Sequence, residues 1–510
     1  MHHICCGLAD NPALPATLVD RLVAVADEDI ATRLARRADL GRAQALALAG
    51  RVPGSAVELA YEGRLAAEDV DPAARPDVAC ALLDQGIGRP GWARLLAGHP
   101  DPGVRERLAA CPGLTEEVVE VLAADPEPRV VAELALSATA EVAARLAGHP
   151  HAEVRWAVAG NEATPPEVLA ALVAGEGPAA LRCLVCDQEE IPFAHDRECP
   201  RLDCALPPGA ACDGSHQWTV HALRESALRN PSTPVEALVG FAEHPSAGLR
   251  WTLAARPDLP REACVRLVSD PVPGVRADVA THPALDEALI RRLADDPHAD
   301  VRRAVAHHPR IPLDVLVRLA RTTRLATVLL PRVAAATPAE VEELAGSAEP
   351  AARMLVAHRR DLPAEVRDRL AGDTDAKVLK AVAGHPGLTE GQLRAMVEGH
   401  GLRILARVAA RPDVSAGLLE DLVRHEPPVQ KVFRVVARHP RATASALLRC
   451  LEDRQARPVA AGHPALPAAV IVELLGDADG QVVEAAAANP ALPPALMAEL
   501  AERAEPMDRQ

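Results

Sequence analysis

The chain has 510 residues, of which 49% are hydrophobic and 25% charged, and its mean hydropathy of +0.02 is typical of a folded globular protein. The net charge of −16, from 55 Lys and Arg against 71 Asp and Glu, argues against broad electrostatic binding to nucleic acid or to an anionic membrane, because both require a cationic surface. With 3 Phe, 4 Trp and 1 Tyr, the core must be built from Leu, Val and Ala.

Residues 1–84 are predicted to form diverged N-terminal capping repeats. Asn11-Pro12 begins a motif that recurs downstream, whereas 38–84 is irregular and is broken at Pro53 and Pro72. The N-terminus has neither a cationic start nor an apolar run of signal length. Nowhere do about 18 apolar residues run together, as a transmembrane helix requires. We therefore expect a cytoplasmic protein without a membrane segment.

Residues 85–180 and 218–510 repeat one pattern with a period of about 26 residues. It is clearest in residues 282–307, HPALDEALIRRLADDPHADVRRAVAH, and motif starts at 256, 282 and 308 are 26 residues apart. Further starts lie at Asn230, His385, Arg411, His439, His463 and Asn489, and looser ones at Cys111, Asn161 and Arg359. The consensus begins with His, Arg or Asn followed by Pro.

The repeat predicts two short helices. Proline after the start residue ends the preceding helix, and the apolar residues that follow have helical spacing. In the clearest copy these are Leu285, Leu289, Ile290 and Leu293. Asp296-Pro297 breaks the chain, and Val301 and Val305 mark a second segment too short to be stable alone. Such units bury their apolar faces only by stacking, so the fold class is predicted to be an all-α solenoid.

The periodicity stops between residues 181 and 217, where five of the 11 cysteines gather. They are Cys183, Cys186, Cys199, Cys204 and Cys212. Cys183 and Cys186 have the C-x2-C spacing with which two thiolates of one turn can bind the same ion. Four of the five cysteines are predicted to bind either Zn²⁺ or an iron–sulfur cluster, since thiolates suit both.

The repeat consensus HPxLPxxxLxxLAxDPxxxVRxxVA resembles the leucine-rich repeat variant family over most of 85–180 and 222–510. The resemblance implies a right-handed superhelix of alternating α and 3-10 helices. It also favours a [4Fe–4S] cluster, since a member of that family carries a four-cysteine cluster module beside its repeats. That module is terminal, whereas the cysteines here are internal. Residues 212–216 also spell CDGSH, a [2Fe–2S] signature, but the Cys-x-Cys pair which that family needs upstream is absent.

Two recurring polar positions are expected to be structural. The histidines of the His-Pro starts, such as His282 and His308, are predicted to cap the previous helix or to bond the turn. The arginines of the Val-Arg position are Arg105, Arg155, Arg276 and Arg302, and Arg250 follows Leu249 there. We expect them to pair with aspartates of the Asp-Pro turns, such as Asp270 and Asp296. An arginine row that binds an acidic partner or phosphate is the alternative.

These observations favour a non-enzymatic scaffold whose solenoid surface binds a protein, with a metal site in the cysteine segment. No nucleophile elbow, phosphate loop or zincin motif occurs in the sequence. The first alternative is an iron–sulfur redox or metal sensor that uses the solenoid as its output. The second is a helical-repeat nucleic-acid enzyme, against which the acidic charge and scarce aromatics argue.

Overall fold

The computed structural model describes residues 1–176, 180–183, 217–325 and 327–504. Within these residues the chain is all-helical, and its only strand-like feature is an isolated bridge between His151 and Arg182. The predicted all-α fold class is confirmed. The helices form two compact units, one made of Met1–Val70, Thr327–Leu329 and Ala336–Gln510, the other of Asp71–Ala326 and Leu330–Ala335. We call these units 1 and 2.

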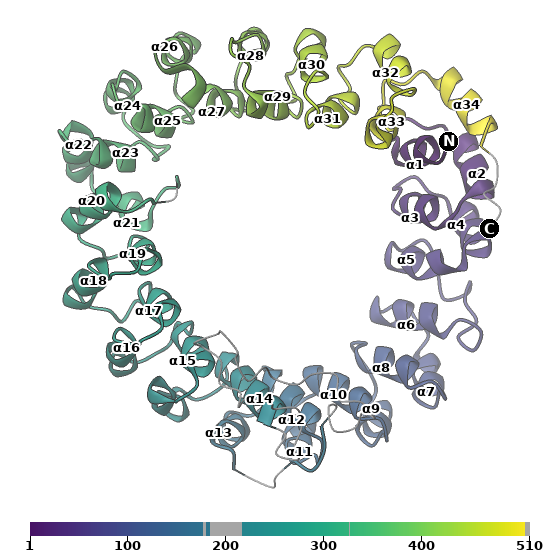
Figure 1. Cartoon of the computed structure of the whole chain (residues 1–510). Coiled ribbons are helices and arrows are strands. Elements are labelled where there is room, and N and C mark those ends of the chain that lie inside the picture. Colours follow the sequence, from purple (N-terminus) through teal and green to yellow (C-terminus); the bar gives the residue numbers. More distant parts are fainter. Residues whose placement is uncertain (177–179, 184–216, 326, 505–510) are drawn as a thin grey trace. The chain divides into compact units, whose positions relative to one another are not determined.

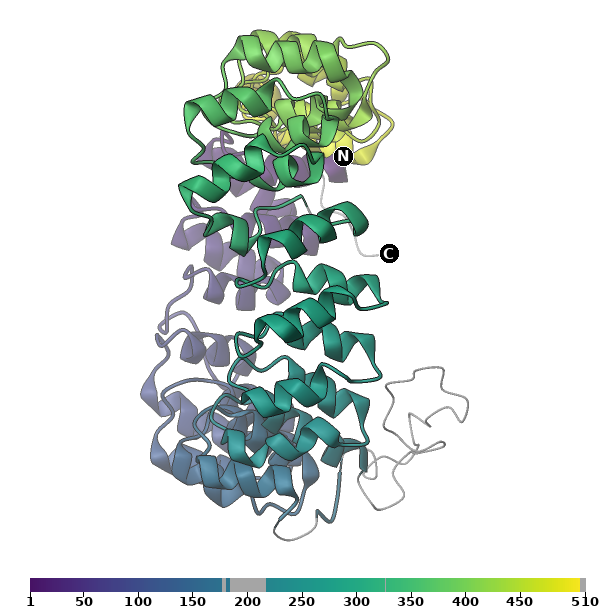
Figure 2. The same ribbon diagram turned by 90° about the vertical axis from the view of Figure 1, so that its left-hand side faces the viewer.

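Each repeat contributes a leading helix after its start motif and a trailing helix after its break, and helices of each kind stack in a row (Figures 1 and 2). The leading row of unit 1 comprises α2 (Ala16–Val25), α4 (Arg42–Arg51), α22 (Pro338–Gly346), α24 (Ala364–Ala371), α26 (Glu390–His400), α28 (Ala416–Val423), α30 (Ala444–Cys450), α32 (Ala468–Leu474) and α34 (Pro494–Glu502). Its trailing row comprises α1 (His2–Asp10), α3 (Glu28–Ala35), α5 (Ala56–Tyr61), α23 (Pro350–Val356), α25 (Ala376–Val382), α27 (Leu405–Ala409), α29 (Gln430–Val436), α31 (Arg457–Ala461) and α33 (Gly480–Ala487). Two 3-10 turns, η1 (Pro53–Ser55) and η4 (Gly401–Arg403), precede α5 and α27.

Unit 2 has the same construction. Its leading row comprises α7 (Pro90–Ala97), α9 (Glu116–Ala123), α11 (Ala140–Leu146), α13 (Pro166–Ala174), the 3-10 segments η2 (Val235–Ala237) and η3 (Val239–Glu243), α16 (Arg261–Leu267), α18 (Glu287–Ala294) and α20 (Leu313–Thr322). Its trailing row comprises α6 (Pro76–Asp84), α8 (Pro102–Ala109), α10 (Pro128–Ser137), α12 (Ala152–Gly160), α14 (Gln217–Arg229), α15 (Ala247–Ala254), α17 (Pro273–Val279), α19 (Ala299–Val305) and α21 (Pro331–Ala334). Most trailing helices of both units are therefore short α-helices.

The core lies between the two rows, and the clearest copy of the motif shows how it is filled. Leu285, Ile290 and Leu293 of the leading segment are at most 1% exposed, and Val301 and Val305 of α19 are fully buried. Leu289 was predicted for the same stripe, but it lies at its edge and is half-buried. The apolar stripe of the leading helix is therefore narrower than its spacing suggests.

The cysteine-rich segment lies inside one repeat, between leading helix α13 and trailing helix α14. Helix α14 nevertheless packs on α12 as the next trailing helix does elsewhere. The Asn230 side-chain amide donates to the carbonyl oxygens of Ala159 and Asn161 at 2.9 and 2.8 Å, although Asn161 is 69 residues away. The stacking of repeats thus continues past the insertion.

In unit 1 the first repeat packs on the last as if it followed in sequence. Helix α1 contacts α33, and α2 contacts α34. The Asn11 amide donates to the carbonyl oxygens of Ala487 and Asn489 at 2.9 and 2.8 Å. Gly7 lies at the crossing of α1 and α33, where a Cβ would overlap the Glu484 carbonyl oxygen and lie 2.7 Å from the Ala487 Cβ. Glycine is therefore required for this close approach.

Candidate protein-binding surface

The predicted metal-binding cysteines fall almost entirely outside the described residues. Cys186, Cys199, Cys204 and Cys212 all lie in 184–216, and only Cys183 belongs to the described part. Cys183 is 1% exposed, and the preceding residues dock on the start of α12, where Ala152 donates its N–H to the Arg182 carbonyl oxygen at 2.8 Å. The described ranges hold no group of three or more His, Cys, Asp or Glu side chains that could bind a metal ion. Metal binding by this segment therefore stays a prediction.

The cysteines inside the repeats behave as small apolar side chains. Burial raises the pKa of the Cys80 and Cys264 thiols to about 11 and that of Cys111 and Cys450 to about 12. All four are buried. Thiols with such pKa values stay protonated near neutral pH and are poor nucleophiles and metal ligands.

The start residues of the repeats form a buried ladder of hydrogen bonds. The His308 Nε2 donates to the His282 carbonyl oxygen at 3.1 Å, and its Nδ1 accepts the Arg310 backbone N–H at 3.1 Å. Arginine forms the corresponding bonds to the preceding repeat elsewhere. One Arg256 nitrogen donates to the carbonyl oxygens of Leu228 and Asn230, both at 2.7 Å. Through these bonds Arg256 and His308 join successive repeats.

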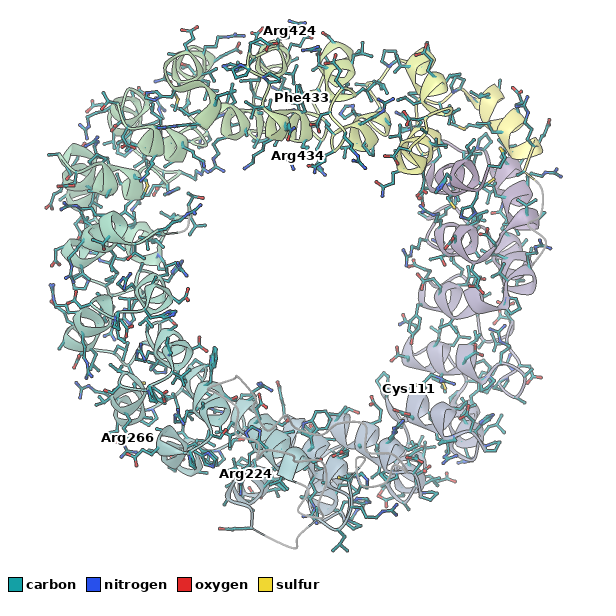
Figure 3. All side chains as sticks on the ribbon, in the orientation of Figure 1. Cys111, Arg224, Arg266, Arg424, Phe433 and Arg434 are labelled. Atoms are coloured by element: carbon teal, nitrogen blue, oxygen red, sulfur yellow. The ribbon has the colours of Figure 1, made fainter. Side chains whose placement is uncertain are left out.

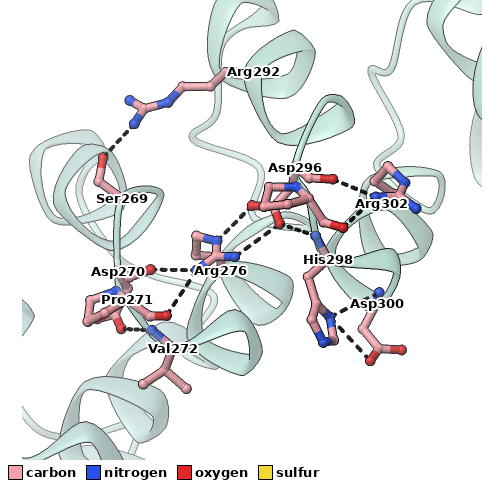
Figure 4. A network of polar contacts seen from close by, with 11 residues as sticks. Ser269, Asp270, Pro271, Val272, Arg276, Arg292, Asp296, His298, Asp300 and Arg302 are labelled. Atoms are coloured by element: carbon pink, nitrogen blue, oxygen red, sulfur yellow. Dashed lines mark hydrogen bonds and ion pairs between the residues drawn. The ribbon is translucent and has the colours of Figure 1, made fainter.

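The arginines of the Val-Arg position form a second structural row (Figure 4). The Arg276 guanidinium pairs with Asp296, 20 residues further on, through Nε–H···Oδ2 and Nη2–H···Oδ1 bonds of 2.7 and 3.0 Å. It also donates to the Asp270 carbonyl oxygen at 2.7 Å. Burial acts to raise the pKa of Asp296, but the Arg276 and His298 donors outweigh it and hold that pKa below its usual range.

The same pairing recurs in other repeats, each time with the aspartate 20 residues further on. Arg105 pairs with Asp125, Arg250 with Asp270 and Arg353 with Asp373. Arg302 instead donates from Nε to the Thr323 hydroxyl at 3.1 Å, because threonine stands where the aspartate would be. The predicted pairing with Asp270 and Asp296 is confirmed for Arg250 and Arg276, and these arginines stabilise the stack.

A different set of cations lies on three neighbouring trailing helices of unit 1. We call it the basic row: Lys377 and Lys380 of α25, Arg403 of η4, Arg407 of α27, Lys431 and Arg434 of α29, and Arg438 just beyond it. Helices α25, α27 and α29 carry no acidic residue, and the chain has no lysine outside this row. In a protein of net charge −16 this is a local reversal of sign.

The cations of the basic row are exposed or half-exposed, and in the part of the chain that the structure describes none of them pairs with a carboxylate. The Arg434 guanidinium meets only neutral oxygen, that of the Gln455 side chain at 2.7 Å. The leading row behind it is different, since Arg424 of α28 pairs with Glu420 at 3.0 Å and Arg394 of α26 pairs with Asp421 at 2.6 Å. Figure 3 shows Arg434 and Arg424 on opposite sides of the two rows of helices.

The basic row was not predicted from the sequence. The repeat pattern singles out the Val-Arg position, whose arginines are paired, and the net charge averaged over 510 residues hides the local excess. The sequence feature that could have revealed the basic row is that every lysine of the chain lies within 377–431. Placing these residues on one row additionally requires knowing that consecutive trailing helices are neighbours.

No family model and no curated protein matches the chain. Among solved structures, the chain is similar to a leucine-rich repeat variant with a novel repetitive protein structural motif, at 25% identity over 47% of this chain and 84% of that chain, with a TM-score of 0.26. It is also similar to an engineered protein, at 16% identity over 92% and 98% of the two chains, and to a chain of a Pds5–Scc1 complex, at 12% identity over 92% and 64%, each with a TM-score of 0.16.

None of the helices in the described ranges is long and apolar enough to cross a membrane.

Proposed function

We propose that this protein is a non-catalytic scaffold that binds an acidic segment of a partner protein along the basic row. The observation that carries the proposal is the set of cations on α25, α27 and α29 without carboxylate partners in the described residues, beside a leading row whose cations are paired. Charge complementarity of this kind speeds association and selects the partner. Leu402, 52% exposed beside Arg403, adds an apolar contact point to the surface.

An acidic protein segment fits this surface better than a nucleic acid does. The row is short, and the protein around it is acidic, which would repel a long phosphate backbone on either side. The aromatic side chain of α29, Phe433, is 7% exposed and cannot stack on a base.

The test is fluorescence anisotropy of the full chain with a labelled Glu-rich decapeptide that contains one leucine. Lys380→Glu with Lys431→Glu should weaken binding by about tenfold or more, and added salt should weaken binding of the unaltered protein. Arg424→Glu changes an exposed cation on the opposite face and should leave the affinity unchanged. Equal losses in both variants, or stronger binding of a single-stranded oligonucleotide than of the peptide, would refute the proposal.

The cysteine segment supports a second proposal that rests on the sequence: four of Cys183, Cys186, Cys199, Cys204 and Cys212 bind Zn²⁺ or a [4Fe–4S] cluster. Metal and sulfide analysis with an absorption spectrum of anaerobically purified protein separates the two. Iron with matching sulfide and absorbance near about 400 nm would favour the sensor role, whereas one zinc would indicate a structural site. Cys186→Ser should lower the metal content, and Cys264→Ser should not.

A further inference from the structure

Two guanidinium groups from adjacent repeats converge on one glycine at the edge of the basic row. A Cβ placed on Gly384, which follows α25, would lie 2.5 Å from Arg360 Nη1 and 2.7 Å from Arg407 Nη2. Arg360 follows α23 and Arg407 lies on α27, so the two side chains reach this point from either side of α25. The absence of a side chain at Gly384 makes room for both.

No carboxylate in the described residues pairs with either guanidinium. Asp361, next to Arg360 in the sequence, is paired with Arg359, and Asp413 is paired with Arg411, each at 2.6 Å. Two like charges held this close repel each other unless an anion lies between them.

Other basic side chains surround the pair. Burial lowers the pKa of Arg360, and Arg407 and Arg411 lower it further. His358 is 9% exposed, and burial together with Arg407 and Arg360 lowers the pKa of its imidazole to about 4, so the ring is neutral near pH 7 and can offer one N–H donor. Arg367, paired with Asp368, is a further cation that acts on the neighbouring His385.

We infer that Arg360 and Arg407, meeting over Gly384, form a binding site for a phosphate group, either free or carried by a bound molecule. Planar guanidinium groups match the oxygens of phosphate in charge and geometry, and two of them balance a dianion, whereas a carboxylate would balance one. This inference refines the proposed function, because Arg407 belongs to the basic row and the site would select a phosphorylated segment among acidic ones.

The test is calorimetric titration of the full chain with inorganic phosphate at constant ionic strength. We expect saturable binding that Arg360→Gln and Arg407→Gln each weaken by about 10- to 100-fold, the usual effect of losing a charge-assisted hydrogen bond. Gly384→Ala is the sharper variant, because it keeps both charges but puts a methyl group where the guanidinium nitrogens lie. It should also weaken binding, while Arg424→Gln should have no effect.

Comparison of ligands identifies the source of the phosphate. Tighter binding of a phosphoserine peptide than of inorganic phosphate indicates a group carried by a partner, and equal binding indicates free phosphate. Absence of saturable phosphate binding, equal binding of acetate, or an unchanged affinity in Gly384→Ala and Arg407→Gln would overturn the inference. Failure here is distinct from failure of the scaffold proposal, since the unphosphorylated Glu-rich peptide tests that surface separately.

Discussion

Histidine, arginine and asparagine are interchangeable at the start of the repeat because each can donate a side-chain N–H to a carbonyl oxygen of the preceding repeat. His463 bonds the His439 carbonyl oxygen at 3.1 Å, and Asn489 bonds the His463 carbonyl oxygen at 2.9 Å. A buried carbonyl without a donor is costly, so the position tolerates any side chain with a donor of suitable reach. The chemistry of the donor, not its charge, is what the repeat requires.

Substitutions at His308 test this equivalence. His308→Asn should change the free energy of unfolding by no more than about 0.5 kcal/mol, because asparagine can form the same bond to the His282 carbonyl oxygen. His308→Ala should lower it by about 1–3 kcal/mol, since a buried carbonyl loses its donor. Urea unfolding followed by circular dichroism measures both. Equal losses in the two variants would contradict the ladder role.

The buried histidines also predict how stability depends on pH. Burial lowers the pKa of His308 and His385 from 6.5, and that of His358 to about 4. Below pH 6.5 the unfolded chain binds protons that the folded chain does not, so stability should be complete above that pH and decline as the pH falls towards 4. The melting temperature between about pH 7.5 and 4.5 reports this decline, and His308→Asn should reduce it. A melting temperature that stays constant down to about pH 5 would contradict the prediction.

At the scale of the helix, the narrow apolar stripe of α18 makes a matched pair of predictions. Leu293 is 1% exposed, whereas Leu289 is half-buried. Leu293→Ala should lower the free energy of unfolding by about 2–5 kcal/mol, because it leaves a cavity between the rows. Leu289→Ala should cost less than half as much. Denaturant unfolding measures the free energy of unfolding of both variants. An equal loss of this free energy in the two would mean that the assigned face of the helix is wrong.

The helices could be predicted from sequence because their determinants are local. Proline at the first turn of α13, α22 and α34 and apolar spacing at 285–293 are properties of a few neighbouring residues. From the sequence, the aspartate that pairs with Arg276 could lie in the same repeat or in an adjacent one. Spacing alone does not give the direction in which the repeats stack, so it does not single out Asp296. The basic row was missed for a related reason: its cations lie in three repeats and form a surface only after those repeats are stacked.

At the scale of the whole chain, the contact between its two ends in unit 1 has no local signal. Asn11 resembles every other start residue, and nothing in its neighbourhood indicates that its carbonyl partners are Ala487 and Asn489. Ion pairs reinforce the contact, with Arg33 bonded to Glu484 at 2.5 Å. The terminal repeats therefore cover each other's apolar faces, which in an open solenoid would need polar caps. The expectation that residues 1–84 are capping repeats did not anticipate this arrangement.

Two helical glycines test the importance of that contact. Gly50 of α4 has open space where a methyl group would lie, with no heavy atom within 4 Å, so Gly50→Ala should stabilise the protein by up to about 1 kcal/mol through helix propensity. Gly7→Ala has the same intrinsic benefit but places its methyl group against the Glu484 carbonyl oxygen. It should destabilise the protein and increase hydrogen exchange in both α1 and α33. Because the two substitutions are chemically identical, stability changes of opposite sign would show that the difference arises from the contact between α1 and α33. Stabilisation by both would show that α1 does not depend on α33.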